Sequence, residues 1–196
     1  MRQPLLLALL ALPVFTAPAL ADCGEELRLA MKRAINSGPY RVESTVTMPE
    51  AVSESRVDIV PGKAMHAVST SGDLHHQTIV IGQRAWMNTD GSWQEMSAEM
   101  AAAAVAGLKS AAADPDTLGV ISGETCLGAS VVDGRDVLRY GYDMRTSEAV
   151  GHSDVLVDAQ TGLPIRTETR TTISGMVGTI VSTYTYDAAI TVTAPP

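Results

Sequence analysis

Residues Thr78 to Glu95 read TIVIGQRAWMNTDGSWQE. Runs of β-branched and aromatic residues are separated here by turn residues at Gly82 and at Asp90-Gly91. An Asp-Gly pair between two such runs is a strong signal for a tight β-hairpin. We therefore expect three short strands. Both tryptophans of the chain, Trp86 and Trp93, lie on them, one on each side of the second turn.

An alanine-rich segment, Ser97 to Ala113, follows directly and contains no aromatic residue. Its apolar residues recur at helical spacing, and the Ser97 hydroxyl can cap the first turn. A helix with so little side-chain bulk lets a sheet approach closely or leaves room for a guest molecule. The combination favours a sheet that curls around this helix, with a space between the two layers as the place to look for function.

The first 21 residues have the features of a signal peptide, with Arg2 as the positive end, Leu5 to Leu12 as the apolar region and Ala19-Leu20-Ala21 as the cleavage motif. Cleavage before Asp22 would leave residues 22–196 as a periplasmic or secreted protein. Lipid attachment at Cys23 is not expected, because it requires a small residue immediately before the cysteine. No later stretch approaches the roughly 18 to 20 apolar residues of a membrane span.

The chain is acidic, with a formal net charge of -8 that becomes -9 when the segment carrying Arg2 is removed. Such a surface repels nucleic acid and anionic headgroups at long range and favours solubility. We therefore expect no nucleic-acid partner. Residues 22–196 are enough for one core and are predicted to form a single domain.

Segments with two-residue alternation follow a predicted opening helix at Asp22 to Ser37, which Gly38-Pro39 ends. The tally is about eleven strands with short turns and no βαβ alternation, which predicts an antiparallel α+β domain. Besides the two strands after Gly82 in the opening stretch, strands are expected at residues 40–48, 53–60, 63–70, 74–81, 124–132, 135–143, 152–158, 163–173, 177–186 and 189–192.

Two cysteines, Cys23 and Cys126, remain in the mature chain. In an oxidising compartment they most simply form one disulfide, which would tie the first helix to the strand after the central helix. A pair of free thiols or an interchain bridge is the alternative.

Three histidines on a predicted hairpin, His66, His75 and His76, are the candidates for a metal site. If Thr70 pairs with Asp73, His66 lies diagonal to His75 on one face, so that two imidazoles would reach one ion. No third ligand is evident from the spacing, and exposed strand histidines are the simpler interpretation. We therefore predict no metal and no cofactor.

Catalytic motifs are missing from the sequence: it has no G-x-S-x-G, H-E-x-x-H, phosphate-binding glycine loop or C-x-x-C. The acids lie scattered at turns and strand edges. Arg166, Glu168 and Arg170 alternate along one strand face, as in a solvated ladder of ion pairs. The sequence therefore indicates a protein that is not an enzyme.

Several segments together resemble the lipoprotein-carrier superfamily, which includes the LolA and LolB carriers, mycobacterial lipid-binding lipoproteins and the amino-terminal domain of the RseB stress regulator. The resemblance covers most of the mature chain. The segments that carry it are YRVE at 40–43, IVIGQRAWM at 79–87, GSW at 91–93, VDAQTGLPIR at 157–166, and YTYD at 184–187 leading to Ile190.

The resemblance implies a strongly curved antiparallel sheet, an unclosed β-barrel, with helices covering its concave side. Such proteins hold acyl chains between the two layers, and the apolar positions of this chain agree with that arrangement. The expected ligand-binding residues are Val42, Val46, Met48, Val57, Ile59, Met65, Ile79, Ile81 and Trp86 on the sheet, with Met100, Val105 and Leu108 on the helix.

Two functions follow from this interpretation. The first is a non-enzymatic periplasmic protein that binds a lipid or the acyl chains of a lipoprotein. The second is an envelope module of the RseB type, in which the same cleft or an exposed sheet edge engages a partner polypeptide.

Overall fold

The structure is a computed structural model that describes residues 22–89, 91–111, 121–145, 149–173 and 175–195. The predicted signal segment and the predicted end of the second helix at Asp114-Pro115-Asp116 lie outside the described residues.

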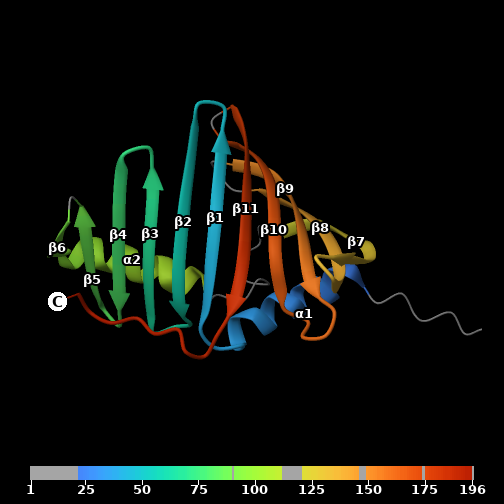
Figure 1. The fold of residues 1–196 in the computed structure, drawn as a ribbon, viewed down its shortest axis with the longest axis horizontal. Helices are drawn as coiled ribbons and strands as arrows, with labels where there is room; N and C mark the ends of the chain where they lie inside the picture. The colour runs from blue at the N-terminus through green and yellow to red at the C-terminus, as the bar shows by residue number, and fades with distance from the viewer. Residues whose placement is uncertain (1–21, 90, 112–120, 146–148, 174, 196) are drawn as a thin grey trace, which may run out of the picture.

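Eleven strands form one antiparallel sheet in the order β6-β5-β4-β3-β2-β1-β11-β10-β9-β8-β7. The order runs between two different end strands, so the sheet is not closed, and it bends as a half-barrel (Figure 1). The predicted α+β fold is therefore confirmed. The strands are β1 Tyr40–Met48, β2 Ala51–Val60, β3 Ala64–Ser71, β4 Leu74–Ile81, β5 Arg84–Thr89, β6 Ser92–Glu95, β7 Ile121–Val132, β8 Arg135–Arg145, β9 Ala149–Asp158, β10 Pro164–Ile173 and β11 Met176–Tyr186.

Two helices lie on the same side of this sheet, one on each half (Figure 1). The helix α1, Cys23–Asn36, packs against β7 and β10, and the helix α2, Ala98–Ala111, packs against β4 and β5. The helices therefore define the concave face, and the opposite face of the sheet is convex.

Local chemistry explains where each helix begins. Asp22 caps α1, because its side chain accepts a hydrogen bond from the Gly24 amide at 3.0 Å. Glu25 and Glu26 in the first turn complement the positive end of the helix dipole. The Ser97 hydroxyl accepts a bond of 3.4 Å from the Met100 amide at the start of α2.

The stretch from Thr78 to Glu95 folds as predicted, into the end of β4, the strand β5 and the strand β6. Gly82 and Gly91 have φ angles of 61° and 86° at the two turns, in the left-handed region that glycine tolerates. Asn88 supports the second turn, since its side-chain oxygen accepts from the Gly91 amide at 3.0 Å.

The prediction of a strand at 189–192 is wrong. Ile190 instead donates to the Asp187 carbonyl at 3.1 Å, and the Asp187 side chain accepts from the Ala189 amide at 2.8 Å. This turn directs the chain into an irregular C-terminal segment that runs along the lower ends of β1 to β5 in Figure 1. We call residues 187–195 the C-terminal segment.

Cys23 and Cys126 form a disulfide, so the prediction of one intrachain bridge is confirmed. It joins the first residue of α1 to β7, across a sequence separation of 103 residues. Because α1 lies beside an end strand of the sheet, the bridge holds this helix on the concave face.

Candidate ligand-binding cleft

Strand register decides which side chains face the helices. Tyr40, Ile59, Met65, Val80 and Ala85 are opposite one another in a single row across β1 to β5. This row packs against α2 in one apolar cluster, and we call it the apolar row. Side chains alternate between the two faces of a strand, so the row assigns every neighbouring position to the concave or the convex face. The helix residues of the cluster are Ala101, Val105 and Leu108.

In the strands β1 to β5 and β9 to β11, the charged side chains lie on the convex face. In the described strands β1 to β5 and β9 to β11, the register places no Asp, Glu, Lys or Arg on the concave face. The convex face of the same strands carries the charged residues, among them the bidentate pair of Arg41 and Asp58. An uncharged concave wall suits an apolar guest, because a buried charge without a partner is costly.

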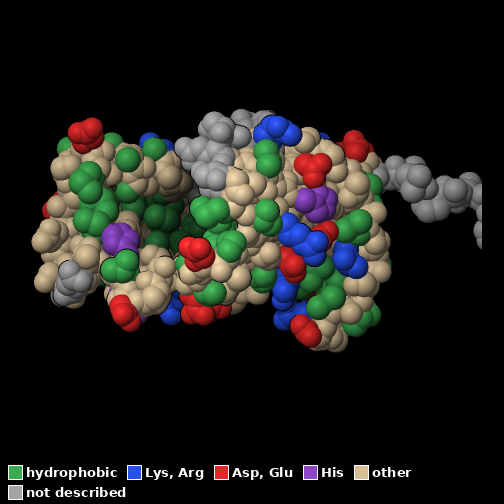
Figure 2. All heavy atoms as spheres, turned by 90° about the horizontal axis from the view of Figure 1, so that it is seen from above, with side chains coloured by type: hydrophobic (Ala, Val, Ile, Leu, Met, Phe, Trp, Pro, Cys, Tyr) green, Lys and Arg blue, Asp and Glu red, His purple; other side chains and the backbone are tan. Residues whose placement is uncertain are grey.

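The upper part of the concave wall is only partly covered. Val42 and Val57 border the apolar cluster, and Val46 and Met48 lie further along β1 on the same face, all of them half-buried. Figure 2 shows the molecule from above as hollowed in this half, with hydrophobic side chains deep inside. The wall therefore opens toward the hairpin ends of the sheet.

The structure brings together six of the predicted ligand-binding residues. They are Val42, Val57, Ile59, Met65, Val105 and Leu108, all in or against the apolar cluster. Val46 and Met48 share their face without belonging to the cluster.

The prediction that Ile79, Ile81 and Trp86 face α2 is wrong. Ile79 is opposite His66 and Trp86, and all three lie on the convex face, because the adjacent Val80 is the residue in the apolar row. Arg84 confirms the outward direction of Trp86, with its guanidinium 4.7 Å from the ring centroid. Residues 79–81 are all apolar, so the sequence shows no alternation there from which to predict which side chains face the helix.

The helices do not account for the burial of Ile79 and Trp86 on the convex face. Ile79 is 5% and Trp86 8% exposed, although neither helix lies on this side. The C-terminal segment crosses the lower ends of these strands in Figure 1, and its Ile190 and Val192 are half-buried. We infer that this segment covers the two side chains.

The placement of Met100 on the inner side of the helix is also wrong. Met100 is 49% exposed, whereas its neighbour Ala101 is 5% exposed and belongs to the apolar cluster. The alanine-rich face packs closely on the sheet, so the bulkier side chain is left outside.

Tyrosines complete the wall and were not among the predicted residues. Tyr184 and Tyr186 of β11 are opposite Val42 and Tyr40 and lie against the apolar cluster. Burial raises the pKa of Tyr40 and of Tyr186 above the ordinary value of a tyrosine. A cavity of about 700 Å³ borders Tyr184 and Tyr186 at the lower end of β11, but most of its lining comes from the β7–β8 and β9–β10 turns and includes Arg135, Asp136 and Asp158, so it is distinct from the apolar wall. The alternation of tyrosines in YTYD at 184–187 is the sequence signal that could have identified them.

The histidines are not brought together. His66 contacts Gln77 at 3.2 Å on the convex face, His75 contacts Thr70 at 3.2 Å, and His76 lies on the concave face beside Thr78. The register pairs Thr70 with His75, so the expected pairing of Thr70 with Asp73 is wrong. Within the described ranges, no group of three His, Cys, Asp or Glu residues is placed to hold a metal ion.

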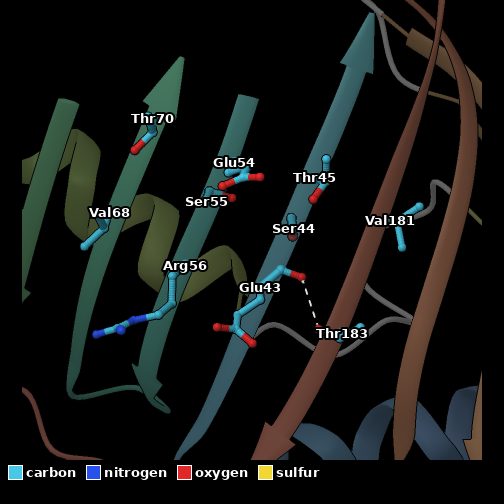
Figure 3. A pocket seen from close by; sticks show the side chains of 10 residues that line it. All are labelled: Glu43, Ser44, Thr45, Glu54, Ser55, Arg56, Val68, Thr70, Val181 and Thr183. Atoms are coloured by element: carbon cyan, nitrogen blue, oxygen red, sulfur yellow. Dashed lines mark hydrogen bonds between the residues drawn. The ribbon is translucent and has the colours of Figure 1, made fainter. Parts of the chain in front are cut away.

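A polar groove of about 340 Å³ runs over β1 to β3 and β11 on the convex face (Figure 3). Its lining includes Glu43, Glu54 and Arg56, so its chemistry differs from that of the concave wall. Ser44 and Ser55 lie behind their strands in this view, since they belong to the opposite face.

None of the described helices is long and apolar enough to cross a membrane. Neither a protein family model nor a curated protein sequence matches the chain.

Solved structures share the fold. The lipoprotein LppX of Mycobacterium tuberculosis aligns with a TM-score of 0.59 and 13% identity, over 88% of this chain and 100% of LppX. LprF from Mycobacterium bovis aligns with a TM-score of 0.54 and 13% identity, over 87% of this chain and 97% of LprF. MucB aligns with a TM-score of 0.50 and 15% identity, over 91% of this chain and 65% of MucB. Identities at this level establish a common fold and leave function to be argued from the site.

Proposed function

Because the chain has the fold of the LolA/LolB-like lipoprotein-carrier superfamily, we propose that it is a non-enzymatic periplasmic protein that binds a lipid or the acyl chains of a lipoprotein. The ligand lies in the cleft between the concave face and the helices. Export by the predicted signal peptide, with cleavage before Asp22, delivers the domain 22–196 to that compartment.

The observation that carries the proposal is the uncharged concave wall. Hydrocarbon transferred from water into such a cleft gains about 0.8 kcal/mol per buried methylene, before the cost of ordering the chain. The half-buried Val42, Val46 and Met48 leave apolar surface for that contact. Shielding acyl chains in an aqueous space between membranes requires this chemistry and no catalytic group.

A matched pair of substitutions tests the cleft. Val46 and Val181 are half-buried valines on the neighbouring strands β1 and β11, on the concave and convex faces respectively. Val46→Gln places a polar amide in the cleft, whereas Val181→Gln places the same amide on the outer face. Native mass spectrometry of the mature protein, purified from envelopes, should show bound lipid for the wild type and Val181→Gln, and at least tenfold less for Val46→Gln. Equal lipid in the two variants, or none in the wild type, contradicts the proposal.

A second function, an interaction module of the RseB type, is favoured by the end strand β7. This twelve-residue strand pairs only with β8 among the described strands, and its Leu127 and Val131 are 46% and 67% exposed. An exposed strand edge can accept an extended peptide as an added strand. A photo-crosslinking residue placed at position Leu127 should then capture an envelope protein from lipid-free preparations. The same residue placed at Leu74 should not.

A further inference from the structure

A row of hydrogen-bonding side chains crosses the concave wall above the apolar row. Following the register from β4 to β10, each strand contributes a hydroxyl or an imidazole at the same level. We call these six residues the hydroxyl row: His76, Ser69, Ser55, Ser44, Ser182 and Thr167.

The row is continuous and lies within the cleft. Its six residues are half-buried, so their polar atoms are neither hidden in the core nor fully in solvent. Strands are spaced about 4.8 Å apart, so six neighbouring strands place these groups along about 24 Å of curved wall. One lateral level of the wall is therefore polar without being charged.

Part of the row is free for a ligand. Ser44 and Ser182 bond to each other at 2.8 Å, and Thr167 contacts the Tyr184 hydroxyl at 3.5 Å. The Ser55 and Ser69 hydroxyls make no hydrogen bond to another described residue. Each of these two groups offers one donor and two acceptor positions to a molecule in the cleft.

The surrounding charges limit what that molecule can be. The concave face of these strands contains no Arg or Lys that would neutralise a phosphate or carboxylate at this level. Ester and hydroxyl oxygens need only neutral partners, which serine and threonine provide. A pure hydrocarbon would leave the row unsatisfied.

We propose that the hydroxyl row selects uncharged amphiphiles whose acyl chains are linked through ester or hydroxyl oxygens, and that it binds those oxygens at mid-depth in the cleft. The inference rests on the proposed lipid-binding function and adds the class of ligand. The acyl chains contact the apolar surface on either side of the row.

The test compares two ligands on one variant. In Ser44→Ala/Ser55→Ala/Ser69→Ala, three hydroxyls are removed and the apolar row is unchanged. Binding of dioleoylglycerol, an uncharged diester, should weaken at least tenfold, which is about 1.4 kcal/mol. Binding of squalene, a hydrocarbon without oxygen, should not weaken, because squalene makes no hydrogen bond to the row. Both affinities are measured by displacement of a fluorescent lipid probe, with circular dichroism confirming the fold.

A matched control removes hydroxyls from the other face of the sheet. Thr45→Val/Thr70→Val/Thr183→Val alters convex positions on β1, β3 and β11 and should leave both affinities unchanged. If the hydroxyl-row variant keeps its affinity for dioleoylglycerol, or loses affinity for both ligands equally, the selectivity is overturned and the lipid-binding function stands. If the wild type binds neither ligand, the proposed function fails, and the selectivity fails with it.

Discussion

Arg41 and Asp58 form the best-defined ion pair of the convex face. Arg41 Nε and a terminal nitrogen donate to the two Asp58 oxygens at 2.6 and 3.1 Å, and the Asp58 side chain is 10% exposed. The hydrogen bonds from Arg41 lower the pKa of Asp58 below its ordinary value. The unfolded chain therefore takes up a proton at higher pH than the folded protein does.

This difference gives a pH-dependent stability. The contribution of Asp58 is fully present above about pH 4, the ordinary carboxyl pKa, and is lost as pH falls through the lowered value. Asp58→Asn should lower the free energy of unfolding by about 2 kcal/mol at pH 7 and by less at pH 3. Urea denaturation at the two pH values measures both.

The control for this prediction is Asp154→Asn, because the Asp154 side chain is 47% exposed on the same face of the sheet. It should change stability by less than about 0.5 kcal/mol at either pH. A constant loss for Asp58→Asn at pH 7 and pH 3 would rule out the titration as the cause.

The face of the sheet on which a single residue lies could be predicted from sequence only where apolar and polar residues alternate along the strand. Val42 and Val57 have charged neighbours, and their placement on the wall was predicted correctly. Ile79 and Ile81 flank another apolar residue, Val80, so three consecutive side chains gave no period. Sequence also could not predict that the C-terminal segment would run along the lower ends of β1 to β5, where we infer that it covers Trp86.

The helix α2 packs on the sheet through one narrow face. Leu108 is 3% exposed within the apolar cluster, whereas Met100 is 49% exposed on the same helix. Leu108→Ala should lower the free energy of unfolding by about 2 to 4 kcal/mol, because it leaves a cavity in the core. Met100→Ala should cost less than about 0.5 kcal/mol. Chemical denaturation compares the two, and an equal loss would contradict the helix orientation described above.

The disulfide ties the other helix to the sheet. Cys23→Ala/Cys126→Ala frees a loop with a sequence separation of 103 residues in the unfolded chain, which should cost about 4 to 5 kcal/mol in the chain-entropy account. Amide hydrogen exchange should accelerate most in α1. Reductant should destabilise the wild type and leave the double variant unaffected; a response of the double variant would point to another cause.

Element boundaries were predictable to a large extent, whereas ladder register was not. Glycine and capping residues mark the turns and helix ends, so the opening helix and the strands from Thr78 to Glu95 were located correctly. Two-residue turns fix register through backbone geometry that composition does not specify. The β3–β4 turn at Gly72-Asp73 places Ser71 opposite Leu74, which moved the histidines from their expected positions. The hydroxyl row depends on five strand registers.

Over the whole molecule, the sheet joins two halves that have separate cores. One cluster lies under α2 on β1, β2, β4 and β5, and the other lies under α1 on β8 and β9. The pairing of β1 with β11 connects the halves, and the chain continues from β11 into the C-terminal segment. The two faces of the sheet therefore differ: the concave face forms the proposed cleft, and the convex face carries the charge pairs and, as we infer, is covered at its lower end by this segment.

Removal of residues 187–196 tests that division. The deletion should expose Ile79 and Trp86 on the convex face and lower the free energy of unfolding by about 2 to 4 kcal/mol. In a Trp93→Phe background, Trp86 is the only tryptophan, so its fluorescence emission should shift to longer wavelength on deletion. Lipid binding should persist, because the cleft lies on the opposite face. An unchanged Trp86 emission would mean that another part of the chain covers this residue, whereas loss of binding with an intact fold would show that the two faces are coupled.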